Sequence, residues 1–308
     1  MKKQFTQFAE NIRLTESQEN DAKTKYDGVC TKLHTSYYCT EYDGKTKLLF
    51  GSYKTKTNVR PITENQDVDV LFKIPKATYD KFQAYVNNGP CALLQEVKGI
   101  LEKKYPETDI KAFGKIVKVS FKGNLHNVEV LPAYEEEDGT FTIPNSENGG
   151  SWDKFNPREQ IALFQSSNCA TNGLTVELAR MVKTWVANNL TCNYKSYKLL
   201  GDVMQCLKYN FEAGADYSEY SNVVKTFFEY LNDNCDENIQ SFVKTALDRA
   251  KKAYDFEKDE KPKEASEEWR KIFGFEGKSE FPLVSSNPIN NTRVFTNPSP
   301  PYGNYKTN

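Results

Sequence analysis

The sequence predicts an α+β protein whose first half mixes helices with strands and whose second half is helical. Two observations predict this division. Before residue 157, four segments alternate apolar and polar residues with a period of two, which is the spacing of half-buried strands. After residue 157 that alternation stops, and apolar residues recur at the three-to-four spacing of amphipathic helices. The chain is therefore expected to divide into residues 1–157, residues 158–282 and a tail, 283–308.

The elements of the first half follow from spacing and from turn residues. Residues 4–38 are predicted to be helical, as a short lead-in and then a long helix. Thr15 and Gln18 have the spacing of a capping box, which favours a helix start between these two segments. A polar loop is expected over 54–66. The expected strands are 47–50, 67–74, 116–121, 126–131 and 140–143, with a turn at 122–125 and helices at 78–86 and 92–105.

The second half carries helical spacing in six segments. A charged stretch, 258–264, is interpreted as a solvated linker. From Phe281 onward Pro, Asn, Ser and Thr dominate, so this tail is predicted to be extended and partly disordered. A cleft between a mixed half and a helical half is a natural ligand site. The expected helices are 159–164, 173–190, 196–211, 218–232, 238–256 and 265–273.

Composition and charge narrow the class of protein. The 41 basic and 42 acidic residues give a net charge of -1, which argues against stable binding along a nucleic-acid duplex. No stretch approaches the ~20 apolar residues that span a bilayer, and no signal peptide is expected, so we predict a cytoplasmic protein without membrane contact. The seven cysteines are scattered without a C-x-x-C pair, which favours reduced thiols over a disulfide scaffold or a zinc site.

Gly51, Ser52, Asp67 and Asp69 are the strongest local signal for chemistry. Asp67 and Asp69 are two residues apart on a predicted strand, so both carboxylates face the same side. A cation relieves their mutual repulsion, and Mg²⁺ prefers hard oxygen ligands of this kind. Gly51 lets the backbone approach a phosphate, whose oxygens the Ser52 hydroxyl can bind. Each pair alone is common on protein surfaces, but together they predict two-metal phosphoryl transfer.

A third carboxylate is expected at this site from a neighbouring strand, and Glu129 is the candidate. It lies between Val128 and Val130 in an alternating segment, so its side chain faces away from theirs. The alternative interpretation is a solvent-facing glutamate on an edge strand.

These residues form part of a longer series of motifs. The first half contains, in order, L-F-G-S-Y, D-V-D-V-L, V-E-V-L-P-A, T-I-P and W-x-x-F-N-P. The second half contains Met181-Val-Lys-Thr-Trp185, Lys195-Ser-Tyr-Lys-Leu-Leu200, and Trp269-Arg-Lys-Ile-Phe-Gly274 with Phe281-Pro282. The series resembles the bacterial CD-NTases, relatives of cyclic GMP–AMP synthase that make cyclic oligonucleotide second messengers in anti-phage defence. The resemblance covers roughly residues 5–282.

The resemblance implies a fold and a metal site. It implies a polymerase-β-like nucleotidyltransferase core with a mixed sheet over residues 1–157, the long N-terminal helix being its spine. It implies a C-terminal helical lobe over residues 158–282 that closes the active-site cleft. It places two Mg²⁺ ions, or Mn²⁺ in their stead, on Asp67, Asp69 and Glu129. The family more commonly has Asp in the third place, and the longer Glu129 can still bind a metal and help to deprotonate the acceptor hydroxyl.

The resemblance also implies substrate contacts in the second half. The family holds the donor triphosphate with a Lys on one helix and a Ser on the next, which match Lys183 and Ser196, and Tyr197 matches an aromatic that stacks on a base. Without the resemblance, Lys183 is a solvated helix-face lysine and Tyr197 is half-buried packing. Asp153 and Asn156 match the segment that lines the acceptor pocket, where Asp153 could accept hydrogen bonds from guanine. The alternative makes both of them turn and N-cap residues.

The implied activity is that of a monomeric cyclic dinucleotide synthase. It condenses two nucleoside triphosphates, such as GTP and ATP, releases pyrophosphate, and makes a second messenger that a product-sensing effector protein detects. A guanine-containing product is expected, with cyclic di-GMP favoured over products that contain adenine or uracil. One alternative is a nucleotidyltransferase that modifies RNA ends, a protein or a small molecule. Another is a nucleotide-binding protein that keeps the fold without catalysis, which the intact aspartates and Ser52 disfavour.

Overall fold

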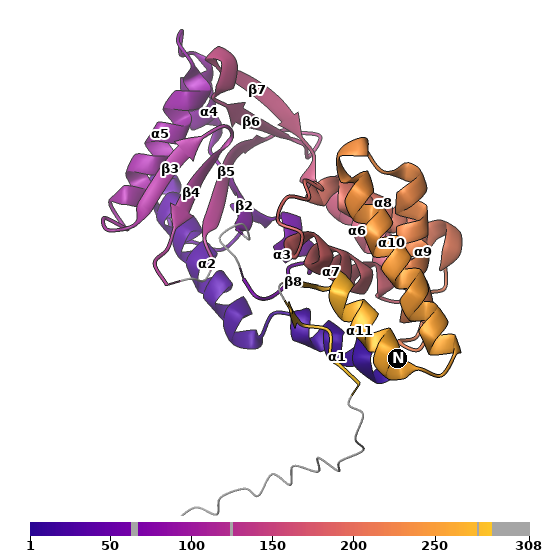
Figure 1. The fold of residues 1–308 in the computed structure, drawn as a ribbon. Coiled ribbons are helices and arrows are strands. Elements are labelled where there is room, and N and C mark those ends of the chain that lie inside the picture. Colours follow the sequence, from indigo (N-terminus) through magenta and orange to yellow (C-terminus); the bar gives the residue numbers. More distant parts are fainter. Residues whose placement is uncertain (63–66, 124–125, 276, 285–308) are drawn as a thin grey trace, which may run out of the picture.

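The computed structural model describes residues 1–62, 67–123, 126–275 and 277–284, which form two halves lying side by side (Figure 1). One half contains a mixed sheet with helices against it, and the other is a bundle of helices. This arrangement confirms the predicted α+β class.

The sheet of the first half is mixed. Its hydrogen-bonded order is β1-β2-β5-β4-β3, in which β2 and β5 run parallel while the other neighbours are antiparallel. The antiparallel pair β6 and β7 continues the sheet from the end of β5. The strands are β1 (Lys47–Leu49), β2 (Val68–Lys73), β3 (Asp109–Phe113), β4 (Ile116–Ser120), β5 (Val128–Glu135), β6 (Phe141–Asn145) and β7 (Ser151–Phe155).

Side-chain alternation decides which face of the sheet is buried. In β2, β4 and β5, pairs of valines two residues apart are fully buried against the covering helices, and the polar residue between the two valines of each pair faces the other side. Three helices lie over the valine face, namely α2 (Glu16–Tyr38), α4 (Lys76–Gln83) and α5 (Gly89–Glu102). The buried valines are Val68, Val70, Val117, Val119, Val128 and Val130.

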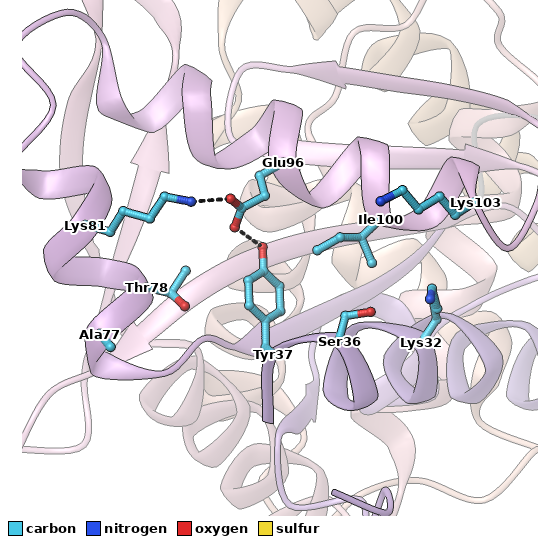
Figure 2. Close-up of a pocket in the computed structure, with 9 residues that line it drawn as sticks. All are labelled: Lys32, Ser36, Tyr37, Ala77, Thr78, Lys81, Glu96, Ile100 and Lys103. Atoms are coloured by element: carbon cyan, nitrogen blue, oxygen red, sulfur yellow. Dashed lines mark hydrogen bonds and ion pairs between the residues drawn. The ribbon is translucent and has the colours of Figure 1, made fainter. Parts of the chain in front are cut away.

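A cavity of about 560 Å³ lies among these three helices (Figure 2). In it the Tyr37 hydroxyl donates a hydrogen bond of 3.1 Å to Glu96, and Glu96 also forms an ion pair with Lys81. Lys32 and Lys103 line the same cavity. Because these helices cover the valine face, the cavity lies behind the sheet, away from the face that carries the acidic residues.

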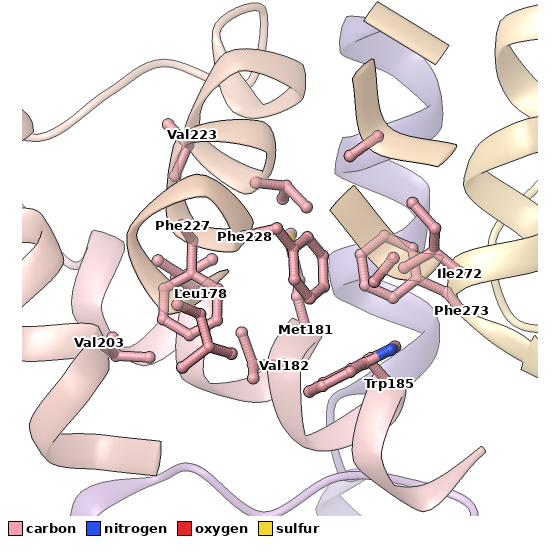
Figure 3. Packing of buried hydrophobic residues seen from close by; sticks show 14 of the residues in the cluster. Leu178, Met181, Val182, Trp185, Val203, Val223, Phe227, Phe228, Ile272 and Phe273 are labelled. Atoms are coloured by element: carbon pink, nitrogen blue, oxygen red, sulfur yellow. The ribbon is translucent and has the colours of Figure 1, made fainter. Parts of the chain in front are cut away.

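The second half packs its helices around α7 (Figure 3). Leu178, Met181, Val182 and Trp185 of α7 are buried among side chains of α8, α9 and α11. No helix within the described ranges is both long and apolar enough to cross a membrane. The elements of this half are α6 (Pro157–Ala170), α7 (Leu174–Ala187), α8 (Ser196–Asn210), α9 (Tyr220–Asn234), α10 (Glu237–Lys258), α11 (Pro262–Ile272), and the short strands β8 (Gly274–Phe275) and β9 (Lys278–Ser279).

The first helix of the chain, α1 (Lys2–Ile12), belongs by its packing to the helical half. Phe5 and Phe8 are fully buried in the same apolar cluster as α7, α9 and α11. The chain then crosses to the sheet half, and α2 begins at the predicted capping box, where the Thr15 side chain accepts from the Gln18 N–H and the Gln18 side chain accepts from the Thr15 N–H. The N-terminal segment therefore links both halves, and the domain division at residue 157 stays a prediction.

Several local elements differ from the sequence prediction. The helix α3 (Gly51–Thr55) occupies the start of the expected loop, and β3 and β7 were not expected because each is a short strand held by pairing with a neighbour. The charged linker is shorter than expected, since α11 already begins at Pro262, and proline is favoured at the first position of a helix. The predicted turn at 122–125 and the tail beyond residue 284 lie partly or wholly outside the described residues.

Phe281, the first residue of the expected tail, packs its side chain into the core. Its side chain is fully buried, and its ring centroid lies 5.0 Å from that of Phe5 and 5.3 Å from that of Phe8. Its ring also lies 6.0 Å from Phe273 and 6.5 Å from Trp269. The segment after β9 thus anchors α1 to α11.

We expect Phe281→Ala to lower the free energy of unfolding by about 4 kcal/mol, because the exchange leaves a cavity among four aromatic rings. Urea denaturation followed by circular dichroism measures this change. The matched control is Leu283→Ala, since Leu283 is 52% exposed and its loss is expected to cost less than about 0.5 kcal/mol. Equal effects of the two exchanges would show that Phe281 does not anchor the two helices.

Candidate active site

The predicted carboxylates lie on one face of the sheet. Asp69 of β2 is directly opposite Glu129 of β5 in the parallel pairing of these strands. Asp67 immediately precedes β2 and is two residues from Asp69, so its side chain faces the same side. The structure therefore brings together the three acidic residues that the sequence predicted as catalytic and metal-binding.

Lys118 is a residue of this site that the sequence analysis missed. It lies on β4 directly opposite Glu129, so Asp69, Glu129 and Lys118 form one row across three neighbouring strands. Its ammonium group forms an ion pair with Asp67 Oδ2 and lies 3.5 Å from Glu129 Oε1. The signal in the sequence was the alternation of Val117, Lys118 and Val119, the same pattern that indicated Glu129.

Burial and crowding disturb the acid–base behaviour of these groups. Burial and the charge of Asp67 raise the pKa of Asp69 to about 6. Burial, a hydrogen bond with Asp67 and repulsion by both aspartates raise the pKa of Glu129 to about 7. Burial alone would lower the pKa of Lys118, but its contacts with Asp67 and Glu129 outweigh burial and raise it. The site therefore concentrates negative charge that calls for a cation.

Gly51 makes the close approach of α3 to Asp69 possible. A short strand, β1, brings the chain to Phe50, whose N–H donates to the Asp69 carbonyl at 3.3 Å, and α3 begins at the next residue. Gly51 has φ +60°, and a Cβ there would lie 2.1 Å from Asp69 Oδ2. Since that distance is far inside van der Waals contact, this position requires glycine. Ser52 follows it in the first turn of α3.

Lys183 of α7 reaches the acidic face from the helical half. Its ammonium group donates a hydrogen bond of 3.0 Å to Thr57 Oγ1. Burial lowers the pKa of Lys183 to about 8, although the negative charge of Asp69 partly offsets this effect. The side chain is half-buried rather than a solvated lysine on a helix surface. A positive charge held between the two halves and close to Asp69 is suited to binding a phosphate.

The carboxylates fit a divalent metal by their chemistry. They offer hard oxygen donors, and Asp67 Oδ1 is buried without a hydrogen-bond partner among the described residues, which a bound cation would satisfy. Within the described part of the chain, no three acidic, histidine or cysteine side chains already lie close enough to enclose an ion. Instead the ammonium group of Lys118 bridges Asp67 and Glu129.

Ser196 and Tyr197 lie at the start of α8. Ser196 is the first residue of this helix, after Lys195 as its N-cap, and its side chain is exposed. Tyr197 is 80% exposed, so the alternative that it is half-buried packing is wrong. An exposed ring is accessible for stacking on a base, and that role stays a prediction.

Asp153 and Asn156 already have partners within the protein. Asp153 lies on β7 and forms an ion pair of 2.8 Å with Lys115, while its other oxygen accepts from the Ser151 hydroxyl at 2.8 Å. Asn156 caps α6, because its side-chain oxygen accepts from the Glu159 N–H at 3.2 Å. The Asn156 contact is the N-cap of the alternative interpretation, whereas Asp153 lies on a strand and is not a turn residue. Base recognition by either residue stays a prediction.

Comparison with known families identifies a match over the first half of the chain. The family described as "Second Messenger Oligonucleotide or Dinucleotide Synthetase domain" matches residues 1–168. Among curated proteins, a probable cyclic nucleotide synthase of Bacillus cereus is 22% identical over 283 residues, which cover 76% of this chain and 83% of that protein.

Comparison with solved structures shows the same fold in proteins from several bacteria. Escherichia coli CdnC, solved with a HORMA protein, has a TM-score of 0.65 at 17% identity, covering 91% of this chain and 98% of its own. A mutant of the Vibrio cholerae di-nucleotide cyclase has a TM-score of 0.68 at 11% identity, covering 89% and 95%. A c-di-GMP synthase of Capnocytophaga granulosa has a TM-score of 0.58 at 15% identity, covering 79% and 82%. The likeness confirms a polymerase-β-like core.

Proposed function

We propose that this chain, which belongs to the second messenger oligonucleotide or dinucleotide synthetases and is a bacterial CD-NTase, is a cyclic dinucleotide synthase that joins two nucleoside triphosphates. The proposal is supported by the acidic face of the sheet, which α3 and α7 both approach. Asp67, Asp69 and Glu129 share the face, Gly51 brings α3 against Asp69, and Lys183 reaches it from the helical half.

The three carboxylates would hold the divalent cations of the reaction. Asp67, Asp69 and Glu129 would hold two Mg²⁺ ions, or Mn²⁺, whose Lewis acidity would neutralise charge on the reacting phosphate. Glu129, which lies opposite Asp69, would help to accept the proton of the acceptor hydroxyl. The acceptor oxygen then bonds to the α-phosphorus of the donor as the bond to pyrophosphate breaks. A second such step closes the ring.

The donor triphosphate would lie between α3 and α7. The backbone and hydroxyl of Ser52 on one side and the ammonium group of Lys183 on the other would bind its oxygens, with Ser196 adding a hydroxyl from α8. Tyr197 would stack on the donor base, a contact that tolerates any base because each has a π-face.

We further propose a guanine-containing product, with cyclic di-GMP favoured. Asp153 can accept from the N1–H and N2–H₂ groups of guanine once its ion pair with Lys115 opens. The ring of Phe155 lies 5.4 Å from that of Phe50, which places the end of β7 beside the start of α3. In this proposal the product is a second messenger in anti-phage defence, made by a monomer in the cytoplasm and detected by an effector protein.

Incubation with labelled nucleoside triphosphates and Mg²⁺ tests the reaction. We expect a phosphatase-resistant product, with one pyrophosphate released for each phosphodiester bond formed. Label appearing on added RNA, on protein or on a small molecule would instead support the transfer of nucleotides to another acceptor. A failure of every nucleotide mixture to yield any labelled product would contradict nucleotide joining.

Lys183→Met is expected to raise the KM for the donor triphosphate and to lower kcat/KM by about 10²-fold, because a single buried charge–phosphate contact is lost. The same exchange is expected to leave the melting temperature unchanged or higher, since burial already disfavours the charged lysine. Steady-state kinetics and thermal unfolding separate the two effects. Lys225→Met on α9 is the control, because Lys225 pairs with Glu229 at 3.0 Å and should change kcat/KM by less than about twofold. Equal kinetics of the two variants would exclude Lys183 from substrate binding.

A further inference from the structure

Lys118 is a cation that offsets part of the negative charge of the acidic face in the described structure. It forms an ion pair with Asp67 Oδ2 and approaches Glu129 Oε1 at 3.5 Å, so it contacts two of the three carboxylates expected to hold metal. Its side chain is 22% exposed, and the Asp67 side chain is 11% exposed. These are partly buried contacts, which water screens less than those of a surface ion pair.

The position of Lys118 follows from the sheet itself. Strand pairing sets it directly opposite Glu129, and the burial of Val117 and Val119 turns its side chain to the acidic face. The next residue along the same row, Lys111 of β3, is different: it is 67% exposed and pairs with Asp109 at 2.9 Å. Of these two lysines, Lys118 is the one that contacts the carboxylates.

Lys118 and a divalent cation need the same oxygen atoms. The Lys118 ammonium group contacts both Asp67 Oδ2 and Glu129 Oε1, so a metal that approaches these two oxygen atoms from that side has to displace it. Asp67 Oδ1, by contrast, is buried without a hydrogen-bond partner among the described residues and remains available. A lysine side chain has four rotatable bonds, so it can withdraw from the carboxylates while β4 stays in place.

We propose that Lys118 is an internal counter-ion that closes the acidic site in the metal-free protein and is displaced when the site takes up divalent cations. Lys118 thereby sets the metal concentration at which the site fills. It also protects the metal-free protein from the repulsion among Asp67, Asp69 and Glu129. This inference rests on the proposed function, because it requires these three carboxylates to be the metal site.

Titration of the nucleotide-free protein with Mn²⁺, followed by electron paramagnetic resonance of the free ion, tests the inference without any activity assay. We expect Lys118→Met to bind Mn²⁺ about tenfold more tightly than the wild type, since no internal cation has to be displaced. Lys118→Arg, which keeps the charge, is expected to stay within about threefold of the wild type. Lys111→Met is the matched control from the same row and should leave the affinity unchanged.

Thermal unfolding supplies a second readout. In EDTA, Lys118→Met is expected to melt below the wild type because the carboxylates lose their counter-ion, and saturating Mn²⁺ should remove that difference. If Lys118→Met does not fold, Lys118→Gln takes its place in both measurements. Equal or weaker Mn²⁺ binding by the uncharged variant would overturn the role of Lys118 alone. An absence of Mn²⁺ binding by the wild type and the variants alike would overturn the proposed metal site as well.

Discussion

Asp69→Asn is expected to abolish nucleotide joining, with a loss in kcat of about 10³-fold or more. Asp69 is the carboxylate that faces Glu129 across the strand pair, lies against Gly51 and attracts Lys183. An amide of the same shape keeps the packing but removes the charge that a divalent cation and Lys183 both require. Product formation from labelled triphosphates at saturating substrate measures the loss.

The same exchange is expected to stabilise the metal-free protein near pH 7.5. Burial and Asp67 raise the pKa of Asp69 to about 6, above its ordinary value of 3.8, so the folded state loses stability as the pH rises through that interval. Asparagine carries no charge and avoids this loss. Thermal unfolding in EDTA should therefore show a higher melting temperature for the inactive variant. Asp109→Asn at the exposed edge of the sheet is the control and should retain full activity. More than a tenth of wild-type activity in Asp69→Asn would remove Asp69 from the reaction.

Gly51→Ala is expected to lower kcat by about 10²-fold or more, although Gly51 has no side chain to contribute to chemistry. A Cβ at this position would lie 2.1 Å from Asp69 Oδ2 and 2.9 Å from its Cγ, so the carboxylate must rotate away from its place opposite Glu129. Displacement of a catalytic group by about 1 Å is enough for such a loss. The φ of +60° adds a cost of about 1 kcal/mol to folding.

Gly99→Ala is the matched control for that variant. Gly99 lies within α5, and nothing is within 4 Å of a Cβ built there. Alanine is the better helix former, so this exchange is expected to leave activity unchanged and to raise stability by about 0.5–1 kcal/mol. Activity in Gly51→Ala that matches Gly99→Ala would show that the approach of α3 to Asp69 is not needed for catalysis.

The sheet half was predictable where alternation is strong. The valines of β2, β4 and β5 alternate with polar residues, and that pattern correctly turned Glu129 toward the face of Asp67 and Asp69. A neighbouring strand was the expected source of Glu129, but its position directly opposite Asp69 could not be predicted, because the register depends on both strands and not on either segment alone. Lys118 was missed for the same reason, although its own alternation carried the signal.

The packing of the two ends of the chain could also not be predicted from the sequence. The apolar stripe of α1 predicts a buried face but not its partner, and only the tertiary structure places Phe5 and Phe8 in the helical half. Phe281 follows β9 and precedes a segment whose composition favours disorder, and one aromatic residue gives little signal against that background. Contacts with four aromatic rings hold Phe281 in the core, although the composition of the following segment favours disorder.

The motif that contains Asp153 and Asn156 does not by itself determine which base is recognised. Asn156 fits both an acceptor-pocket residue and a helix cap, and the structure shows its oxygen already engaged by the Glu159 N–H. Asp153 likewise has Lys115 and Ser151 as partners. A base that binds there has to compete with these contacts, so the identity of the base depends on energies that residue types alone do not give.

Mass spectrometry of the product formed from all four nucleoside triphosphates with Mg²⁺ is the decisive test of cyclic dinucleotide synthesis, with Asp69→Asn as the blank. We expect a cyclic product whose mass equals that of two nucleoside monophosphates less two waters, that contains guanine, and that is missing from the blank. A linear or protein-linked nucleotide as the end product, or a cyclic product made equally by Asp69→Asn, would contradict it.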